Sequence, residues 1–147
     1  MSNNSQAEHR KAISQGRVLV VDDAAANREL LSEILAVEGY DVATAQDGLD
    51  ALSQLAEPLP DVIISDLRMP RMSGFEFLAV VRGKYPDVPL LAISGEFEGN
   101  EVPPGVSADA YLPKGSFTFE QLRSTITELR SAPPSRPGPA AVGLEPV

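Results

Sequence analysis

Five polar residues lie at the ends of short apolar runs, and their carboxylate, hydroxyl and amine groups are those that bind metal ions and anions. They are Asp22, Asp23, Asp66, Ser94 and Lys114. A lone carboxylate at the end of a buried strand is unfavourable, because burial removes the water that stabilises its charge. The adjacent acids Asp22 and Asp23 repel each other unless a cation lies nearby. Taken alone, Asp66 is explained equally well as a turn-forming residue, so the interpretation depends on what the fold brings together.

Five stretches rich in β-branched and aliphatic residues indicate strands, and runs that are apolar throughout are typical of strands buried on both faces of a parallel sheet. Strands are expected over residues 17–21, 40–45, 61–67, 88–94 and 108–112. Helices are expected over 24–38, from 47 to before Pro58, over 74–84 and from after Thr118 to about Arg130. This alternation predicts an α/β fold with a doubly wound five-stranded parallel sheet and helices on both faces. In such a sheet the five polar residues converge on the carboxyl edge of the strands.

Local signals refine the helix boundaries. Asp23 is expected to cap the first helix and Ser73 the third, while Thr118 and Gln121 have the spacing of a capping box. In the second helix, Leu49, Leu52 and Leu55 are expected to lie on one face. Between the fourth and fifth strands the chain allows at most one or two helical turns. The helix breakers there are Gly99, Pro103, Pro104 and Gly105.

Composition narrows the class of protein. The 147 residues carry a net charge of −9, with a pI near 4.5, which argues against a nucleic-acid or anionic-membrane surface. The absence of cysteine excludes disulfides and thiolate metal sites. We expect one domain over residues 16–131, a mobile arm over 1–15 and a disordered proline-rich tail over 132–147. The single histidine, His9, is expected to be an exposed residue of the arm.

Four motifs, in order along the chain, resemble those of the response-regulator receiver domain of two-component signalling. They are VLVVDD at 18–23, VIISDLRMP at 62–70, LLAISG at 90–95 and ADAYLPK at 108–114. Secondary signatures of the family match at Asn27-Arg28, Asp47-Gly48 and Gly74-Phe75. The resemblance covers about residues 17–130 and implies a flavodoxin-like, CheY-like sheet in the strand order 2-1-3-4-5.

The resemblance also implies a metal-dependent phosphoacceptor site. Asp66 would accept the phosphoryl group. Asp23 and Asp66 would bind Mg²⁺ together with the backbone carbonyl of Arg68, while Asp22 would act mainly through a bound water. A hard cation such as Mg²⁺ suits carboxylates, a carbonyl and waters, and it would offset the repulsion between two anions.

The remaining roles implied by the resemblance concern the phosphoryl group and its signal. Ser94 would donate a hydrogen bond to the phosphoryl group, and Lys114 would form an ion pair with it. Tyr111 occupies the aromatic switch position. Arg68 and Glu96 lie two residues after Asp66 and Ser94, at positions that resemble gates, and we expect them to pair and slow hydrolysis of the phosphoaspartate.

The chain departs from the family pattern in two places. The family has Lys-Pro with a cis peptide at the end of the fifth strand, whereas this chain has Lys114-Gly115, for which a trans peptide is expected. The family's Phe after that Pro is matched one residue late by Phe117. The segment after Ser94 is about two residues short and predicts a short or irregular fourth helix, which leaves the usual dimer face incomplete.

We therefore expect a cytoplasmic, stand-alone receiver domain that takes a phosphoryl group from a sensor histidine kinase or a phosphotransfer protein. It would signal to a downstream protein by contact, as a monomer or weak dimer. It would bind neither nucleic acid nor membrane, and it would not be an enzyme that turns over an external substrate. The alternative is a phospho-independent binding module with the same fold. An aspartyl-phosphate hydrolase is disfavoured, because many such phosphatases carry a second Asp two residues after the nucleophile and this chain has Arg68 there. Dinucleotide binding is disfavoured because the sequence has no G-x-G-x-x-G loop.

Overall fold

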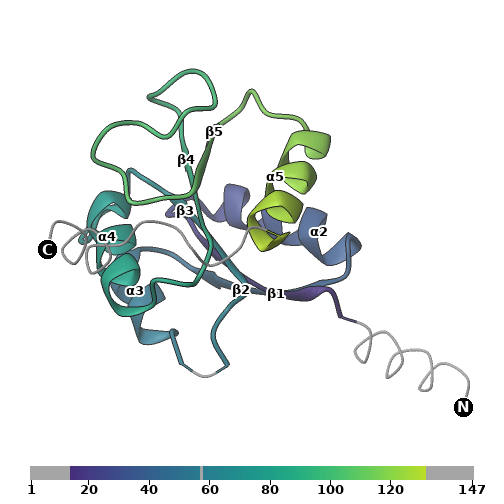
Figure 1. The fold of residues 1–147 in the computed structure, drawn as a ribbon, viewed down its shortest axis with the longest axis horizontal. Coiled ribbons are helices and arrows are strands. Elements are labelled where there is room, and N and C mark those ends of the chain that lie inside the picture. The colour runs from purple at the N-terminus through teal and green to yellow at the C-terminus, as the bar shows by residue number, and fades with distance from the viewer. Residues whose placement is uncertain (1–13, 57, 132–147) are drawn as a thin grey trace, which may run out of the picture.

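A computed structural model describes residues 14–56 and 58–131, and it shows a parallel sheet between two layers of helices (Figure 1). The strands are β1 (Gly16–Val21), β2 (Tyr40–Ala45), β3 (Val62–Asp66), β4 (Leu90–Ser94) and β5 (Ala110–Pro113). The helices are α2 (Ala25–Val37), α3 (Gly48–Ser53), α4 (Gly74–Lys84) and α5 (Phe119–Ser131). The predicted tail over 132–147, His9 and all but the last two residues of the predicted arm lie outside the described residues.

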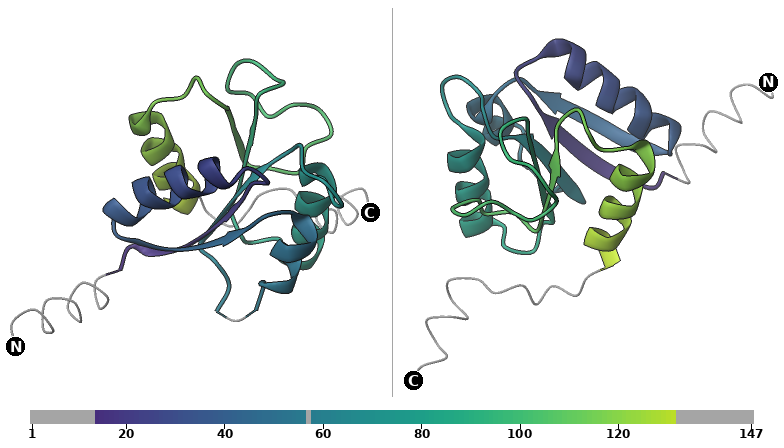
Figure 2. Two further views of the ribbon diagram at one scale, coloured as in Figure 1. Left: turned by 180° about the vertical axis from the view of Figure 1, so that it is seen from behind. Right: turned by 90° about the horizontal axis from the view of Figure 1, so that it is seen from above.

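The five strands are all parallel and lie in the order β2-β1-β3-β4-β5, which confirms the predicted fold class and strand order. Helices α2 and α5 cover one face of the sheet, and α3 and α4 cover the other (Figures 1 and 2). The central strands β3 and β4 are buried along their whole length, as their largely apolar sequences predicted.

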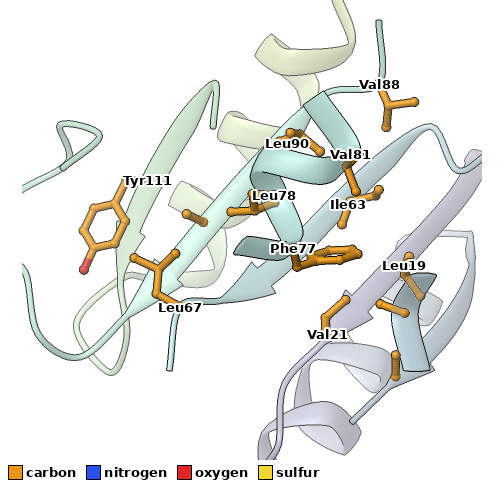
Figure 3. Packing of buried hydrophobic residues seen from close by; sticks show 13 residues of the cluster. Leu19, Val21, Ile63, Leu67, Phe77, Leu78, Val81, Val88, Leu90 and Tyr111 are labelled. Atoms are coloured by element: carbon orange, nitrogen blue, oxygen red, sulfur yellow. The ribbon is translucent and has the colours of Figure 1, made fainter. Parts of the chain in front are cut away.

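Alternate residues of each strand point to opposite faces, so the sheet separates two hydrophobic clusters. In β1, Leu19 and Val21 belong to the cluster under α3 and α4, whereas Val18 and Val20 belong to the cluster under α2 and α5. Figure 3 shows the first cluster, in which Phe77, Leu78 and Val81 of α4 lie over the strands. This packing fixes the strands, and therefore the positions at which their carboxyl ends emerge.

The predicted helix caps are confirmed at two sites and wrong at one. Ser73 and Glu76 form a capping box at α4, and Thr118 and Gln121 exchange the same pair of hydrogen bonds before α5. Asp23 does not cap α2: the cap position is Ala24, which makes no side-chain hydrogen bond. The carboxylate that accepts from the Ala24 N–H is that of Asp22, at 2.9 Å, because Asp22 points inward from the end of β1.

The single face expected for the three leucines of the second helix does not form, and Leu49 is 48% exposed. Helix α3 ends at Ser53, so Leu55 lies beyond it and the three leucines do not form one continuous stripe. Ala51 is fully buried and takes the inward position instead.

Residues 95–109, all of them described, contain no helix, so the expected irregular fourth helix is absent altogether. The core is covered there by partly buried side chains of the connection, including Phe97, Val102 and Val106. An ion pair anchors its far end, because Arg82 Nη2 lies 2.9 Å from Asp109 Oδ1. None of the helices in the described ranges is long and apolar enough to cross a membrane.

Candidate functional site

Three carboxylates meet at the carboxyl edge of the sheet. Asp22 and Asp23 follow β1, and Asp66 is the last residue of β3, the neighbouring strand. One oxygen from each of the three side chains lies within 4.8 Å of the others. Asp22 and Asp66 are buried, whereas Asp23 is exposed at the mouth of the cluster. The predicted convergence is therefore present in the structure.

Lys114 follows β5 and supplies the positive charge of this cluster. Its Nζ lies 2.7 Å from Asp66 Oδ2 and 3.1 Å from Asp22 Oδ2. Its backbone N–H donates to the Ser94 carbonyl at 2.8 Å, which fixes the start of the loop after β5. Burial opposes the charge of Lys114, but its hydrogen bonds to Asp66 and Asp22 outweigh burial and raise its pKa.

The electrostatics of the cluster leave room for a further cation. Burial raises the pKa of Asp66, and the charge of Asp22 adds to the effect although Lys114 opposes it. Asp22 Oδ2 is buried, and the contact that the structure gives it is with the Lys114 ammonium at 3.1 Å. Three carboxylates and one ammonium leave an excess of negative charge, and the hard carboxylate oxygens fit a divalent cation of the Mg²⁺ type. Arg68, whose carbonyl was predicted as a further ligand, lies on the same corner, and its N–H donates to Asp66 Oδ1 at 3.3 Å.

Ser94 and Tyr111 lie on the other side of Asp66. The partner of Asp66 in β4 is Ile93, so Ser94 is the next residue toward the carboxyl edge. Ser94 Oγ is buried and accepts from the Glu96 N–H at 3.1 Å, which leaves its own proton available. The hydroxyl of buried Tyr111 lies 2.7 Å from the carbonyls of both Ser94 and Phe97, and burial raises its pKa.

The two expected gate residues form an ion pair over the site. Arg68 Nε lies 2.7 Å from Glu96 Oε1, and both side chains are largely exposed. The Arg68 guanidinium also lies over the ring of Phe75, at 5.8 Å from its centroid. The structure thus shows the predicted contact, while its effect on a phosphoryl group stays a prediction.

Two glycines shape the loops that carry the site. Gly115 has φ +84°, which the ring of a proline forbids, so the family's Lys-Pro sequence does not fit this backbone. At Gly74, the first residue of α4, an added Cβ would collide with the Asp66 carbonyl oxygen and lie 2.7 Å from Leu67 Cα. Helix α4 therefore starts directly against the backbone of Asp66.

Sequence reasoning missed one ion pair next to the site. Asp47 was interpreted as the start of a helix and as part of a family signature, and it caps α3 by accepting from the Asp50 N–H at 2.8 Å. Its buried carboxylate also accepts from Arg71 Nε at 2.9 Å. Arg71 belongs to the loop after Asp66, and no residue pattern predicts that its side chain reaches α3.

The chain matches the model of the response regulator receiver domain over residues 18–127. The protein belongs to this family. The response regulator MprA of Mycobacterium sp. (strain KMS) is 38% identical over 130 residues, which cover 86% of this chain and 56% of that protein. The chain thus spans about half the length of the curated relatives that it matches.

Solved structures of receiver domains share the fold. The response regulator TrrA of Thermotoga maritima, crystallised in complex with Mg²⁺ and BeF, is 35% identical with a TM-score of 0.69, covering 77% of this chain and 97% of that one. TrrA in complex with the histidine kinase ThkA gives 35% identity and a TM-score of 0.70, covering 78% of this chain and 98% of that one.

Proposed function

We propose that this receiver domain accepts a phosphoryl group on Asp66 from a phosphohistidine and signals by protein contact. The observation that carries the proposal is the contact of Lys114 Nζ with both Asp66 and Asp22, at 2.7 and 3.1 Å, inside a cluster of three carboxylates. A buried anion cluster with one lysine suits a reaction in which charge moves onto phosphoryl oxygens. The TrrA structures with Mg²⁺ and BeF and with a histidine kinase support the same role.

In the proposed reaction an oxygen of the Asp66 carboxylate attacks phosphorus, a P–O bond forms, and the P–N bond to the donor histidine breaks. Asp23 and Asp66, with the Arg68 carbonyl, would hold Mg²⁺, which supplies positive charge to the phosphoryl oxygens when bound. Lys114, whose Nζ lies 2.7 Å from Asp66 Oδ2, would add a second positive charge. The chain then carries a phosphoaspartate and releases no product of its own, so we propose a phosphoacceptor rather than an enzyme with external turnover.

Ser94 and Tyr111 offer a route for the signal. The Ser94 hydroxyl accepts from Glu96 and can still donate its proton to a phosphoryl oxygen. Movement of Ser94 toward that oxygen would shift its carbonyl, which accepts from the Tyr111 hydroxyl. Because the same hydroxyl contacts the Phe97 carbonyl, the shift would reach the helix-free connection over residues 95–109.

The proposed partners are a sensor histidine kinase or a phosphotransfer protein, and a downstream target protein. A groove opens beside Asp22 and Lys114 between α2 and the loop after β5, with Leu30 and Phe119 exposed near it. A phosphohistidine must approach Asp66 from this edge of the sheet, and the apolar side chains give its carrier a surface to contact. We propose a cytoplasmic protein, a monomer or weak dimer, that binds neither nucleic acid nor membrane.

The test is binding of beryllofluoride, which mimics a phosphoryl group, followed by amide NMR with Mg²⁺ present. Wild type should show shifts at Asp66, Ser94 and Tyr111, and Asp66→Asn should show none. Lys114→Ala should bind more weakly and lose the shift at Tyr111. Wild-type spectra that do not change under any of these conditions would favour the phospho-independent binding module.

A further inference from the structure

The loop between β3 and α4, residues 67–73, contains a strained turn. Arg71 has φ +68°, and no other non-glycine residue in the described ranges 14–56 and 58–131 has a positive φ. The Met72 N–H donates to the Pro70 carbonyl at 2.7 Å and closes a three-residue turn around Arg71. Positive φ with this hydrogen bond defines the rare, strained form of the γ-turn. A side chain other than glycine stays in such a turn only where its surroundings enforce it.

Asp47 provides that enforcement. Both Nε, at 2.9 Å, and Nη2 of Arg71 donate to Asp47 Oδ2, so a single buried oxygen holds the guanidinium at two points. The other oxygen of Asp47 caps α3 through the Asp50 N–H, which keeps the carboxylate from turning away. These hydrogen bonds lower the pKa of Asp47, so it is charged at neutral pH. The turn is therefore tied to a different helix across the sheet face.

Close packing restricts the 67–73 loop at two further points. A Cβ at Gly48 would lie 2.7 Å from Met72 Cγ, so the loop lies directly on the first turn of α3. At the other end, Gly74 lies against the backbone of Asp66 and Leu67. With the Asp47–Arg71 pair, these contacts leave the loop little freedom to change its path.

We propose that Asp47 and Arg71 are positioning residues that hold the Asp66–Arg68 corner in the geometry that binds the divalent cation. The inference depends on the proposed function, because the corner supplies the Asp66 carboxylate and the Arg68 carbonyl to that cation. The strained turn at Arg71 is compensated by the ion pair, and neither residue touches the cation or the phosphoryl group. Their effect is on where the backbone of the corner lies.

The experiment measures Mg²⁺ affinity without phosphorylation, by titration followed through amide NMR shifts, since the chain has no tryptophan. Asp47→Asn keeps the helix cap, and Arg71→Asn keeps a residue that tolerates positive φ, so each removes the ion pair with little else. Each variant should bind Mg²⁺ about tenfold more weakly, as for changes just outside a metal's ligands, and the Arg68 amide should shift in the metal-free state. The double variant should be no weaker than either single one.

The matched control is Arg82→Asn, which removes the other partly buried arginine–aspartate pair at the opposite edge of the sheet, where Asp109 also accepts from the Leu90 N–H at 2.8 Å. It should lower the melting temperature and leave Mg²⁺ affinity unchanged. The inference would be overturned if Asp47→Asn and Arg71→Asn bind Mg²⁺ within about twofold of wild type, or if they lose no more Mg²⁺ affinity than Arg82→Asn does. Wild type that binds no Mg²⁺ would instead overturn the proposed function.

Discussion

Gly74→Ala tests how tightly α4 lies against the phosphoacceptor strand. The added Cβ would collide with the Asp66 carbonyl oxygen and lie 2.7–2.9 Å from Leu67 Cα and the Asp66 carbonyl carbon, and backbone yields less readily than a side chain. Overfilling a packed site costs about 1–3 kcal/mol, and we expect the upper end here. The helix preference of alanine offsets about 1 kcal/mol of that cost. The net loss should be about 2 kcal/mol, which lowers the melting temperature of a domain of this size by about 8 °C.

Gly83→Ala is the matched control, because it makes the same substitution in the same helix with no atom within 4 Å of the added Cβ. It should raise the free energy of unfolding by about 0.5–1 kcal/mol. Both values come from urea unfolding followed by circular dichroism. If Gly74→Ala is as stable as wild type, or if both variants change in the same direction, the close approach of α4 to Asp66 is wrong.

Three further predictions concern the gate, the cation and pH. Arg68→Ala and Glu96→Ala should each speed loss of the phosphoryl group, and the double variant should be non-additive; dephosphorylation rates that match wild type or simply add would remove the gate. Millimolar Mg²⁺ should raise the melting temperature of wild type and have little effect on Asp23→Asn, whereas no rise in wild type would contradict the metal site. Asp47 has a lowered pKa, so the stability it contributes is present above its ordinary value of 3.8 and is lost as pH falls through its lower folded value. The stability gap to Asp47→Asn, from unfolding curves at several pH values, should therefore shrink in acid, and a constant gap would contradict this account.

The sheet and the positions of its polar strand ends followed from sequence because they depend on short-range patterns. Runs such as those of β3 and β4 are largely apolar, which is typical of strands in a parallel sheet that is covered on both faces. Once the strands were predicted to be parallel, Asp22, Asp66 and Lys114 had to lie at the same edge of the sheet, because each follows or ends a strand.

What sequence missed depends on contacts between distant segments. Asp23 has the right type for a helix cap, but Ala24 takes the cap position and no side chain caps α2. The glycines and prolines after Ser94 predicted a short or irregular helix. They did not predict that the helix is absent and that Phe97 and neighbouring side chains of the connection cover the core instead. The contact between Arg71 and Asp47 could not be predicted, since it joins residues 24 positions apart in the chain.

The most direct test of the central claim is the intact mass of the protein after incubation with a small phosphodonor and Mg²⁺. Wild type should gain a single phosphoryl group that maps to Asp66 after reduction of the acyl phosphate and peptide sequencing. Asp66→Asn should gain none. A phosphorylated histidine kinase or phosphotransfer protein should phosphorylate wild type faster than the small phosphodonor does. A wild-type chain that stays unmodified with every donor, or a phosphoryl group on another residue, would contradict the assignment of Asp66 as the phosphoacceptor.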